Sequence, residues 1–179
     1  MNPSGVPAGS GRGGGTERPV RILFVCLGNI CRSPAAEGVF LHLLERQGLE
    51  RAFRVDSAGT GHWHVGRPAD PRMRSAAGRR GIELPSRARQ ISADDLSRFD
   101  HVLTMDRQNL RDVLALATPG VATARIGPLT SHCRRFTLEE VPDPYYGGEE
   151  SFERVLDLLE DACTGLLETL RAEQLGHGN

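Results

Sequence analysis

The sequence predicts an α/β fold, an open and doubly wound parallel sheet of four strands with helices on both faces. Short apolar segments alternate with segments whose apolar residues recur at helical spacing, and this alternation occurs four times. The first apolar segment, VRILFVC at 20–26, is almost continuous, as in a strand buried on both faces. Near the end of the chain, an apolar stripe from Phe152 to Leu170 predicts a long amphipathic helix.

The predicted elements follow one another along the chain. We expect strands at 20–26, 53–59, 100–105 and 121–127, and helices at 34–47, 69–81, 92–97, 106–117 and around the stripe at 152–170. Gly48 is typical of a helix end, and Pro71 is typical of a helix start. Ser92 is expected to cap the short helix that follows it.

The chain has 179 residues, which suits one domain, expected at 19–175. Residues 1–18 are rich in Gly and Pro and predict a disordered tail, and 176–179 predict a flexible C-terminus. The formal net charge is -1, so the charge balance does not point to nucleic acid or a membrane surface as a partner. No segment is long and apolar enough to span a membrane, and the N-terminus has no secretory apolar core, so a cytoplasmic protein is expected.

The four cysteines are too few for a disulfide scaffold and lack the paired spacing of zinc sites. His62 and His64 have the spacing of a metal pair, but no third ligand accompanies them in the sequence. We therefore expect no metal and no cofactor.

The segment between the first strand and the next helix carries the chemistry. Cys26 ends the strand, five residues separate it from Arg32, and Ser33 and Pro34 follow. Pro34 suits the first helical position, with Ser33 as the N-cap. Gly28 gives the loop conformational freedom. Inward backbone N–H groups and a helix N-terminus would create an anion site at the carboxyl edge of the sheet.

Such an environment favours a thiolate, which is the nucleophilic form of cysteine. The planar guanidinium of Arg32 can hold two phosphoryl oxygens at once. The pattern therefore predicts a cysteine-dependent phosphatase that needs no metal, with Cys26 as nucleophile. The alternative is a buried cysteine at a strand end and an arginine on the surface. The predicted phosphate-binding loop comprises Leu27, Gly28, Asn29, Ile30, Cys31 and Arg32.

The segment VCLGNICRSPAAE resembles the signature of the low molecular weight protein tyrosine phosphatases. VDSAGT, VGRPADPR, ARQI, FDHVLTMD and DPYYGG resemble further segments of that family in the same order, so the similarity covers residues 20–175. The chain looks like a bacterial member with eukaryotic-like residues at the mouth of the site. The resemblance implies flavodoxin-like strand order, a phosphocysteine intermediate and phosphotyrosine-containing protein substrates. A tyrosine kinase is among the expected partners, and a monomer is expected.

The reaction needs a carboxylic acid that protonates the leaving group and later activates water. Asp143 lies between two prolines, which keep the segment out of a helix. By itself this pattern suits a turn aspartate equally well. The resemblance matches Asp143 to the general acid of the family.

Several polar residues are expected to support the loop. By resemblance, the Ser33 hydroxyl assists the cysteine thiolate as a leaving group, and Asn29 and Ser57 brace the loop through hydrogen bonds. Asp106 follows a strand end, so capping of the next helix and a catalytic role both fit it. Many vertebrate relatives have a histidine where this chain places Arg80, so no bracing role is assigned to Arg80.

Aromatic residues predict the mouth of the site. Trp63, the only tryptophan, lies in a glycine-rich segment, and Tyr145 and Tyr146 follow Asp143. Aromatic walls would stack on a phenyl ring and make a cleft too deep for phosphoserine. Core packing is the alternative for Trp63. The curled loop would also let Cys31 approach Cys26, and the resemblance implies a protective disulfide between them under oxidation.

Three other functions remain open at this stage. A protein-arginine phosphatase of the same fold typically has threonine before the second cysteine of the loop, where this chain has Ile30. An arsenate reductase needs a further cysteine pair, but Cys133 and Cys163 are far apart and Cys163 lies on the apolar stripe. A non-catalytic phosphotyrosine-binding module would not need Cys26, Arg32 and Asp143 together.

Overall fold

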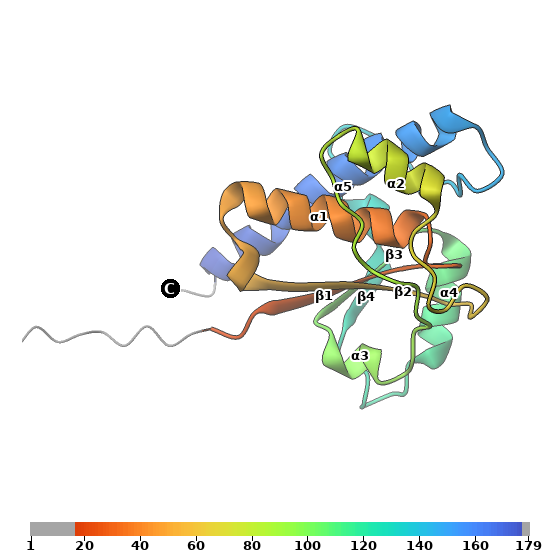
Figure 1. Ribbon diagram of the computed structural model, residues 1–179. Coiled ribbons are helices and arrows are strands. Elements are labelled where there is room, and N and C mark those ends of the chain that lie inside the picture. Colours follow the sequence, from red (N-terminus) through yellow and green to blue (C-terminus); the bar gives the residue numbers. More distant parts are fainter. Residues whose placement is uncertain (1–16, 177–179) are drawn as a thin grey trace, which may run out of the picture.

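The computed structural model describes residues 17–176, which form a four-stranded parallel sheet between two layers of helices (Figure 1). The strands lie in the order β2-β1-β3-β4, and every neighbouring pair is parallel. This confirms the predicted α/β fold with flavodoxin-like strand order. Their bounds are Val20–Cys26 for β1, Phe53–Gly59 for β2, His101–Thr104 for β3 and Arg125–Pro128 for β4.

The predicted tail lies mostly outside the described residues, and of the predicted flexible C-terminus at 176–179 only Gly176 is described, as the last residue of a helix. Arg18 is described, and its guanidinium pairs with Asp100 at 2.7 Å.

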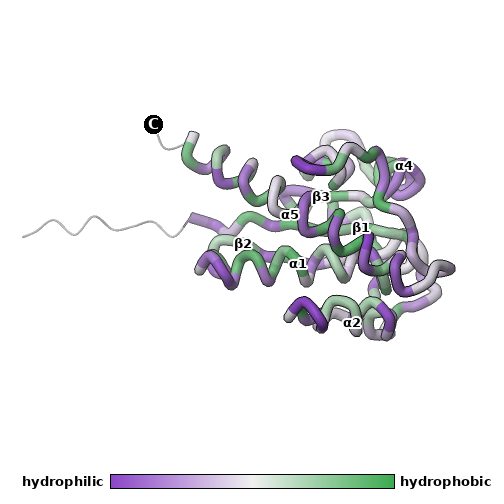
Figure 2. The backbone as a smooth tube through the Cα atoms, turned by 90° about the horizontal axis from the view of Figure 1, so that it is seen from above, coloured by the Kyte–Doolittle hydropathy of each residue, from purple (hydrophilic) through white to green (hydrophobic). Residues whose placement is uncertain are grey.

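Helices cover both faces of the sheet. Their bounds are Arg32–Gln47 for α1, Pro71–Gly78 for α2, Asp95–Arg98 for α3, Arg107–Leu116 for α4 and Glu149–Gly176 for α5, with single 3₁₀ turns at Glu50–Ala52 and Leu129–His132. Figure 1 shows α1, α2 and α5 above the sheet and α3 below it. Seen from above in Figure 2, hydrophobic residues run along β1 and along α1.

The sheet separates two hydrophobic clusters. Alternate residues of β1 point to opposite faces, with Phe24 in the cluster beneath α1 and α5 and Leu23 in the cluster beside α3 and α4. Phe40 of α1 packs on Phe24 and Phe53 with ring centroids 5.9 and 5.6 Å away. Because β1 is central and covered on both faces, its sequence shows an apolar run rather than alternation.

Several helix ends agree with the sequence pattern. Gly48 ends α1 in the left-handed conformation, with φ 66°. Pro71 begins α2, and the Asp70 carboxylate caps that helix by accepting from the N–H of Arg72.

Other boundaries differ from the prediction for local reasons. Helix α1 begins at Arg32, so Ser33 is not its N-cap; the Ser33 hydroxyl faces Cys26 instead. Ser92 does not cap α3, because its N–H and hydroxyl donate to Asp95. The chain at 121–124 precedes β4, since the N–H groups of residues 123 and 124 bond to Leu96 rather than to β3.

Candidate active site

The predicted phosphate-binding loop lies at the carboxyl edge of the sheet, between the end of β1 and the start of α1. It forms the floor of a cavity of about 330 Å³. The cavity is lined by Cys26, Leu27, Gly28, Ile30, Cys31, Arg32, Trp63, His64, Asp143, Tyr145 and Tyr146. The predicted nucleophile, arginine, acid and mouth residues therefore share one cavity, although they come from three separate parts of the chain.

Cys26 is positioned to carry negative charge. Its sulfur accepts a hydrogen bond from the Asn29 N–H at 3.3 Å and lies 3.0 Å from the Ser33 hydroxyl. The side chain is only 2% exposed and lies just before the N-terminus of α1, whose dipole favours an anion. These donors can stabilise negative charge on the sulfur when it acts as a nucleophile or as a leaving group.

The sharp curl of the loop occurs at Asn29, whose φ is 57°. Asparagine tolerates this left-handed conformation better than most residues. The sequence indicated conformational freedom at Gly28, but Gly28 does not have a positive φ; a Cβ there would approach the His64 ring to 3.0 Å. Gly28 therefore leaves room for the loop against His64, and Asn29 makes the turn.

Arg32 is 3% exposed and is held from two sides. Its Nη1 donates to the Asp106 carboxylate at 2.7 Å and to the Val141 carbonyl at 3.1 Å. Burial disfavours its charge, but the Cys26 thiolate and the carboxylates of Asp106 and Asp143 outweigh this and raise the pKa of Arg32. The guanidinium is thus a fixed cation at the base of the cavity.

Asp106 caps α4, one of the two roles that the sequence left as alternatives, and it also holds Arg32. One carboxylate oxygen accepts from the Asn109 N–H at 2.8 Å and caps α4, and the other holds Arg32. It does not line the cavity. We therefore regard Asp106 as a positioning residue that acts through Arg32.

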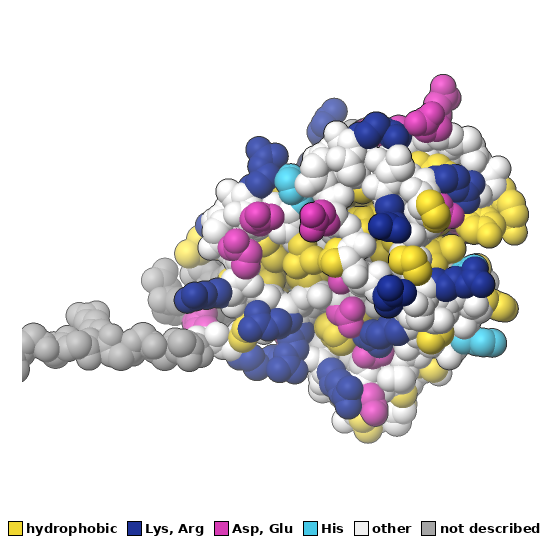
Figure 3. Space-filling model, in the orientation of Figure 1, with side chains coloured by type: hydrophobic (Ala, Val, Ile, Leu, Met, Phe, Trp, Pro, Cys, Tyr) yellow, Lys and Arg dark blue, Asp and Glu magenta, His cyan; other side chains and the backbone are white. Residues whose placement is uncertain are grey.

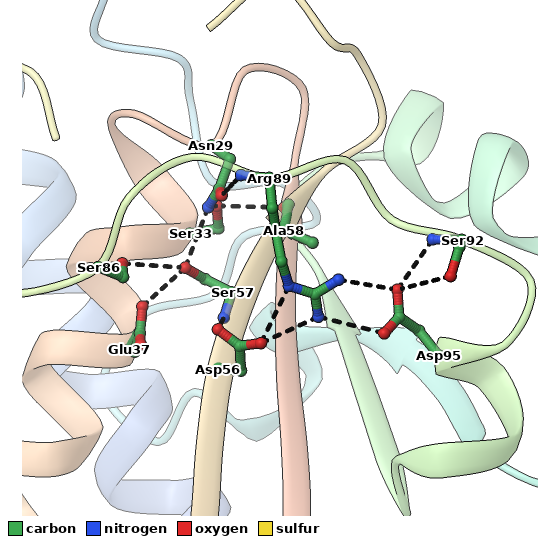
Figure 4. A network of polar contacts seen from close by, with 10 residues as sticks. All are labelled: Asn29, Ser33, Glu37, Asp56, Ser57, Ala58, Ser86, Arg89, Ser92 and Asp95. Carbon is green, nitrogen blue, oxygen red and sulfur yellow. Dashed lines mark hydrogen bonds and ion pairs between the residues drawn. The ribbon is translucent and has the colours of Figure 1, made fainter. Parts of the chain in front are cut away.

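A polar network braces the loop from below (Figure 4). The Asn29 amide donates to the Ser33 hydroxyl at 2.8 Å and to the Ser57 hydroxyl at 3.0 Å, so the three predicted supports meet. Ser57 in turn donates to Glu37 at 2.7 Å. The Asn29 side-chain oxygen accepts from the N–H of Arg89 at 3.0 Å. Every polar atom of the Asn29 side chain is thereby engaged.

Glu37 and Arg89 were not predicted from the sequence. Glu37 is 5% exposed, and burial raises its pKa. Arg80, to which no bracing role was assigned, lies elsewhere and pairs with acidic residues of α5, namely Glu153, Asp157 and Glu160.

Asp143 lies at the rim of the cavity, above Arg32. Its carboxylate is 46% exposed, with one oxygen 3.7 Å from Nη2 of Arg32 and the other accepting from the Tyr145 N–H at 3.1 Å. Proline on both sides and the contact to Tyr145 fix the segment in a non-helical form. Asp143 can therefore reach both a bound phosphoryl group and water.

The rim of the cavity is aromatic, with Trp63, Tyr145 and Tyr146 among its lining residues. Trp63 is 63% exposed and stacks on His62, which excludes the core-packing alternative for Trp63. Tyr145 and Tyr146 pack edge to face with centroids 4.9 Å apart. His64 also lines the cavity and was predicted only as half of a metal pair.

Arg72 connects the acid segment to the loop, and the sequence did not single it out. Its guanidinium lies 5.4 Å from the Tyr145 ring centroid and 4.7 Å from that of Phe152, and it donates twice to Asp70. The N–H of Asp70 donates to the carbonyl of Ile30 at 2.8 Å. Arg72 therefore holds Tyr145, and through it Asp143, in register with the phosphate-binding loop.

Replacing Arg72 by alanine is expected to lower kcat/KM for aryl phosphates by about tenfold, because the cation–π contact that holds the Tyr145 ring is lost, together with the ion pair that anchors Arg72 to Asp70. Arg72→Lys should recover part of this, since a lysine keeps the charge but not the planar fork. Steady-state kinetics on both variants tests this. Arg74→Ala on the same helix, where the arginine is exposed, is the matched control. Equal losses in Arg72→Ala and Arg74→Ala would contradict the positioning role.

The remaining cysteines are free thiols. Burial, with the Asp70 charge as a second cause, raises the pKa of Cys31 to about 12, so it is a thiol at neutral pH. Cys163 is fully buried on α5, as its place on the apolar stripe predicted. Burial raises the pKa of Cys133 to about 11. Of the cysteines, Cys26 has the surroundings of a nucleophile.

Among residues 17–176, no three His, Cys, Asp or Glu side chains gather in a way that could hold a metal ion. In the same part of the chain, no helix has the length and apolar character needed to cross a membrane.

Comparison with known proteins places the chain in one family. The family model of the low molecular weight phosphotyrosine protein phosphatases matches residues 21–175. A low molecular weight protein-tyrosine-phosphatase from Streptomyces coelicolor is 42% identical over 158 residues, which cover 87% of this chain and 96% of the relative. The crystal structure of a protein tyrosine phosphatase from Entamoeba histolytica matches with a TM-score of 0.83 and 41% identity, covering 87% of this chain and 99% of that one.

A structure described as a Drosophila arginine phosphatase also matches, with a TM-score of 0.79 and 32% identity over 83% of this chain and 96% of that one. The chain belongs to the low molecular weight phosphotyrosine protein phosphatase family. It is a hydrolase of the protein-tyrosine-phosphatase class.

Proposed function

We propose that the chain hydrolyses phosphotyrosine in proteins through a phosphocysteine intermediate, without a metal ion. The observation that carries this proposal is the placement of the Cys26 sulfur, which accepts from the Asn29 N–H and lies beside Ser33 in the cavity that also contains Arg32 and Asp143. The proposed nucleophile Cys26, the oxyanion-binding Arg32 and the proposed acid Asp143 thus line the same cavity.

In the first step the Cys26 thiolate attacks phosphorus, and the bond between phosphorus and the tyrosine oxygen breaks. Arg32 binds two of the phosphoryl oxygens through its fork, and backbone N–H groups of the loop bind the charge that spreads over them. Asp143 gives its proton to the leaving phenolate oxygen. The products of this step are the dephosphorylated tyrosine side chain of the substrate protein and phosphocysteine.

In the second step the Asp143 carboxylate takes a proton from water while the water oxygen attacks phosphorus. The bond between sulfur and phosphorus breaks, and Cys26 leaves as a thiolate. The Ser33 hydroxyl, 3.0 Å from the sulfur, can donate a hydrogen bond to that charge. Inorganic phosphate departs, and Asp143 is again protonated.

Specificity for phosphotyrosine comes from the rim. Trp63, Tyr145 and Tyr146 flank the cavity and offer ring faces to a phenyl group, while the thiolate lies at the floor. A phosphoserine side chain is shorter and would not carry its phosphorus to the sulfur. The depth of the cavity therefore selects the longer aromatic ester.

Competing functions are disfavoured by particular residues. Ile30 lines the cavity where arginine phosphatases typically have threonine. An arsenate reductase would have to pass a disulfide outward, but Cys163 is fully buried. A binding module would not need an acid beside Arg32. A tyrosine kinase partner, a monomeric state and a cytoplasmic location stay predictions.

The chain is expected to release phosphate from p-nitrophenyl phosphate in the presence of EDTA and to be inhibited by vanadate. Among peptides carrying phosphotyrosine, phosphoserine or phosphoarginine, phosphotyrosine should give the highest kcat/KM, because only its ring fills the aromatic mouth. A malachite-green assay of released phosphate measures both the activity in EDTA and the preference among the peptides. Loss of activity in EDTA would refute a metal-free mechanism, and preference for phosphoarginine would refute the assigned substrate.

We further propose that Cys31 protects Cys26 from irreversible oxidation. Hydrogen peroxide would oxidise the Cys26 thiolate to a sulfenic acid and be reduced to water; the Cys31 sulfur would then displace water and form a disulfide. Both cysteines are buried in the same loop. We expect dithiothreitol to restore activity after brief peroxide treatment in the wild type but not in Cys31→Ser. Equal recovery in both proteins would contradict this role.

A further inference from the structure

A second cavity, of about 620 Å³, lies away from the catalytic loop. It is lined by Arg21, Arg54, Val55, Asp56, Arg89, Asp95, Arg98 and Phe99. Arg21 and Arg54 lie near the amino ends of β1 and β2, and Arg98 ends α3. Cys26 is five residues further along β1 than Arg21, which places the two backbones roughly 16 Å apart at the ordinary rise of a strand.

The charges around this cavity do not balance. Four arginines and two aspartates line it, so the formal sum is +4 − 2 = +2. Arg89 pairs with both aspartates. Its guanidinium donates to the carboxylate of Asp56 at 3.0 Å and to that of Asp95 at 3.0 and 3.2 Å (Figure 4). Three guanidiniums therefore face the cavity without a carboxylate of their own.

The guanidiniums of Arg21, Arg54 and Arg98 bond only to backbone carbonyl groups or have no hydrogen bond within residues 17–176. Within residues 17–176, Arg21 donates to the Arg98 carbonyl at 3.4 Å, Arg54 donates to the Phe53 carbonyl at 3.2 Å, and no ion pair forms on any of the three. Each guanidinium has five N–H donors, so most of them face water. All three side chains are exposed.

Within residues 17–176, other exposed arginines, among them Arg46 and Arg154, also lack an ion pair. Arg79 and Arg80, by contrast, are both paired with carboxylates of α5. What distinguishes Arg21, Arg54 and Arg98 is that all three line one cavity. Figure 3 shows the basic side chains gathered over the region where β1 and β2 begin and where α3 lies. Like charges that share one cavity repel, and an anion bound among them relieves that repulsion.

We propose that this cavity is a second anion site, which binds a ligand carrying several phosphate-type groups. Guanidinium forks match the oxygens of such groups, two N–H donors at a time. Three guanidinium groups around one open cavity can bind several linked phosphate groups, which suits an oligophosphate better than a single phosphate. Val55 and Phe99 add apolar wall that an organic portion of the ligand would contact.

Calorimetric titration of inorganic tripolyphosphate into the full chain tests the site. Saturating vanadate is present throughout, so that the catalytic loop is occupied. We expect one tripolyphosphate to bind per chain, and Arg54→Ser and Arg98→Ser each to weaken its Kd by about tenfold, the usual scale for one charge-assisted contact. Arg154→Ser, which removes an equally exposed charge on α5, is the matched control and should change the Kd less than twofold.

Thermal unfolding of the three variants shows whether each is folded. Absence of binding in the wild type with vanadate present would overturn the proposal. Equal weakening in Arg154→Ser and in the two pocket variants would also overturn it, because it would show general charge attraction rather than a site. Amide shifts in NMR spectra of the titration should be largest at residues 54, 55 and 99; shifts confined to residues 26–33 would place the ligand in the catalytic loop and refute the second site.

Discussion

Replacing Cys26 by serine is expected to abolish turnover of p-nitrophenyl phosphate. The loop stabilises a sulfur anion through the Asn29 N–H and the Ser33 hydroxyl, but a serine hydroxyl stays protonated at neutral pH and is a poor nucleophile. We expect kcat to fall to the background of the assay while vanadate or phosphate still binds, since Arg32 and the loop N–H groups remain. Initial rates and calorimetry with phosphate measure the two properties.

Cys133→Ser is the matched control for this experiment. Cys133 is half-buried beyond the 3₁₀ turn at Leu129–His132 and lies outside the cavity, so its variant should keep wild-type kinetics. Substantial turnover by Cys26→Ser would contradict the assignment of the nucleophile. Loss of phosphate binding together with turnover would instead show that the loop had collapsed, and Cys26→Ala would then repeat the measurement without a hydroxyl.

Replacing Asp143 by alanine is expected to lower kcat for phosphotyrosine peptides by roughly 10²–10⁴, as is usual for loss of a general acid. The reason is that a tyrosine phenolate must receive a proton as it leaves, and within the cavity Asp143 is the carboxylate nearest to Arg32. An aryl ester with a more acidic leaving group needs less protonation, so its rate should fall less. Steady-state rates on a series of aryl phosphates measure this dependence.

The control for this second experiment is Asp94→Ala, because Asp94 is exposed and makes no side-chain cap bond. A loss that is the same for every leaving group would argue that Asp143 holds Arg32 rather than transferring a proton. Unchanged kcat would remove Asp143 from the mechanism altogether.

Much of the fold follows from short-range patterns. The apolar run of β1 and the stripe on α5 reflect burial of whole elements, which a sequence shows directly. The exact starts of α1 and β4 depend on contacts from other segments, and these have no local signal. The role of Ser33 has a different cause, which lies within its own loop: the sulfur of Cys26 and the amide of Asn29 engage its hydroxyl, so it does not cap the helix.

The residues of the candidate site likewise divide into those that the sequence predicts and those that it does not. Cys26 and Arg32 are predictable because the loop that joins a strand to a helix brings them together with its own backbone. Glu37, Arg72 and Arg89 are not, since they act on residues far along the chain; Asn29 and the Arg89 N–H are 60 positions apart. The sequence signal for Arg72 was only that of a helix start, Asp-Pro-Arg, which says nothing about the ring of Tyr145.

The covalent intermediate is the central claim, and rapid quenching of the Asp143→Ala variant during turnover of an aryl phosphate tests it most directly. Without its acid and base, this variant should hydrolyse the intermediate slowly and accumulate it. Peptide mass spectrometry of the acid-quenched protein is predicted to show a phosphoryl group on Cys26. A phosphoryl group on another residue, or an unmodified Cys26 throughout turnover, would contradict the mechanism.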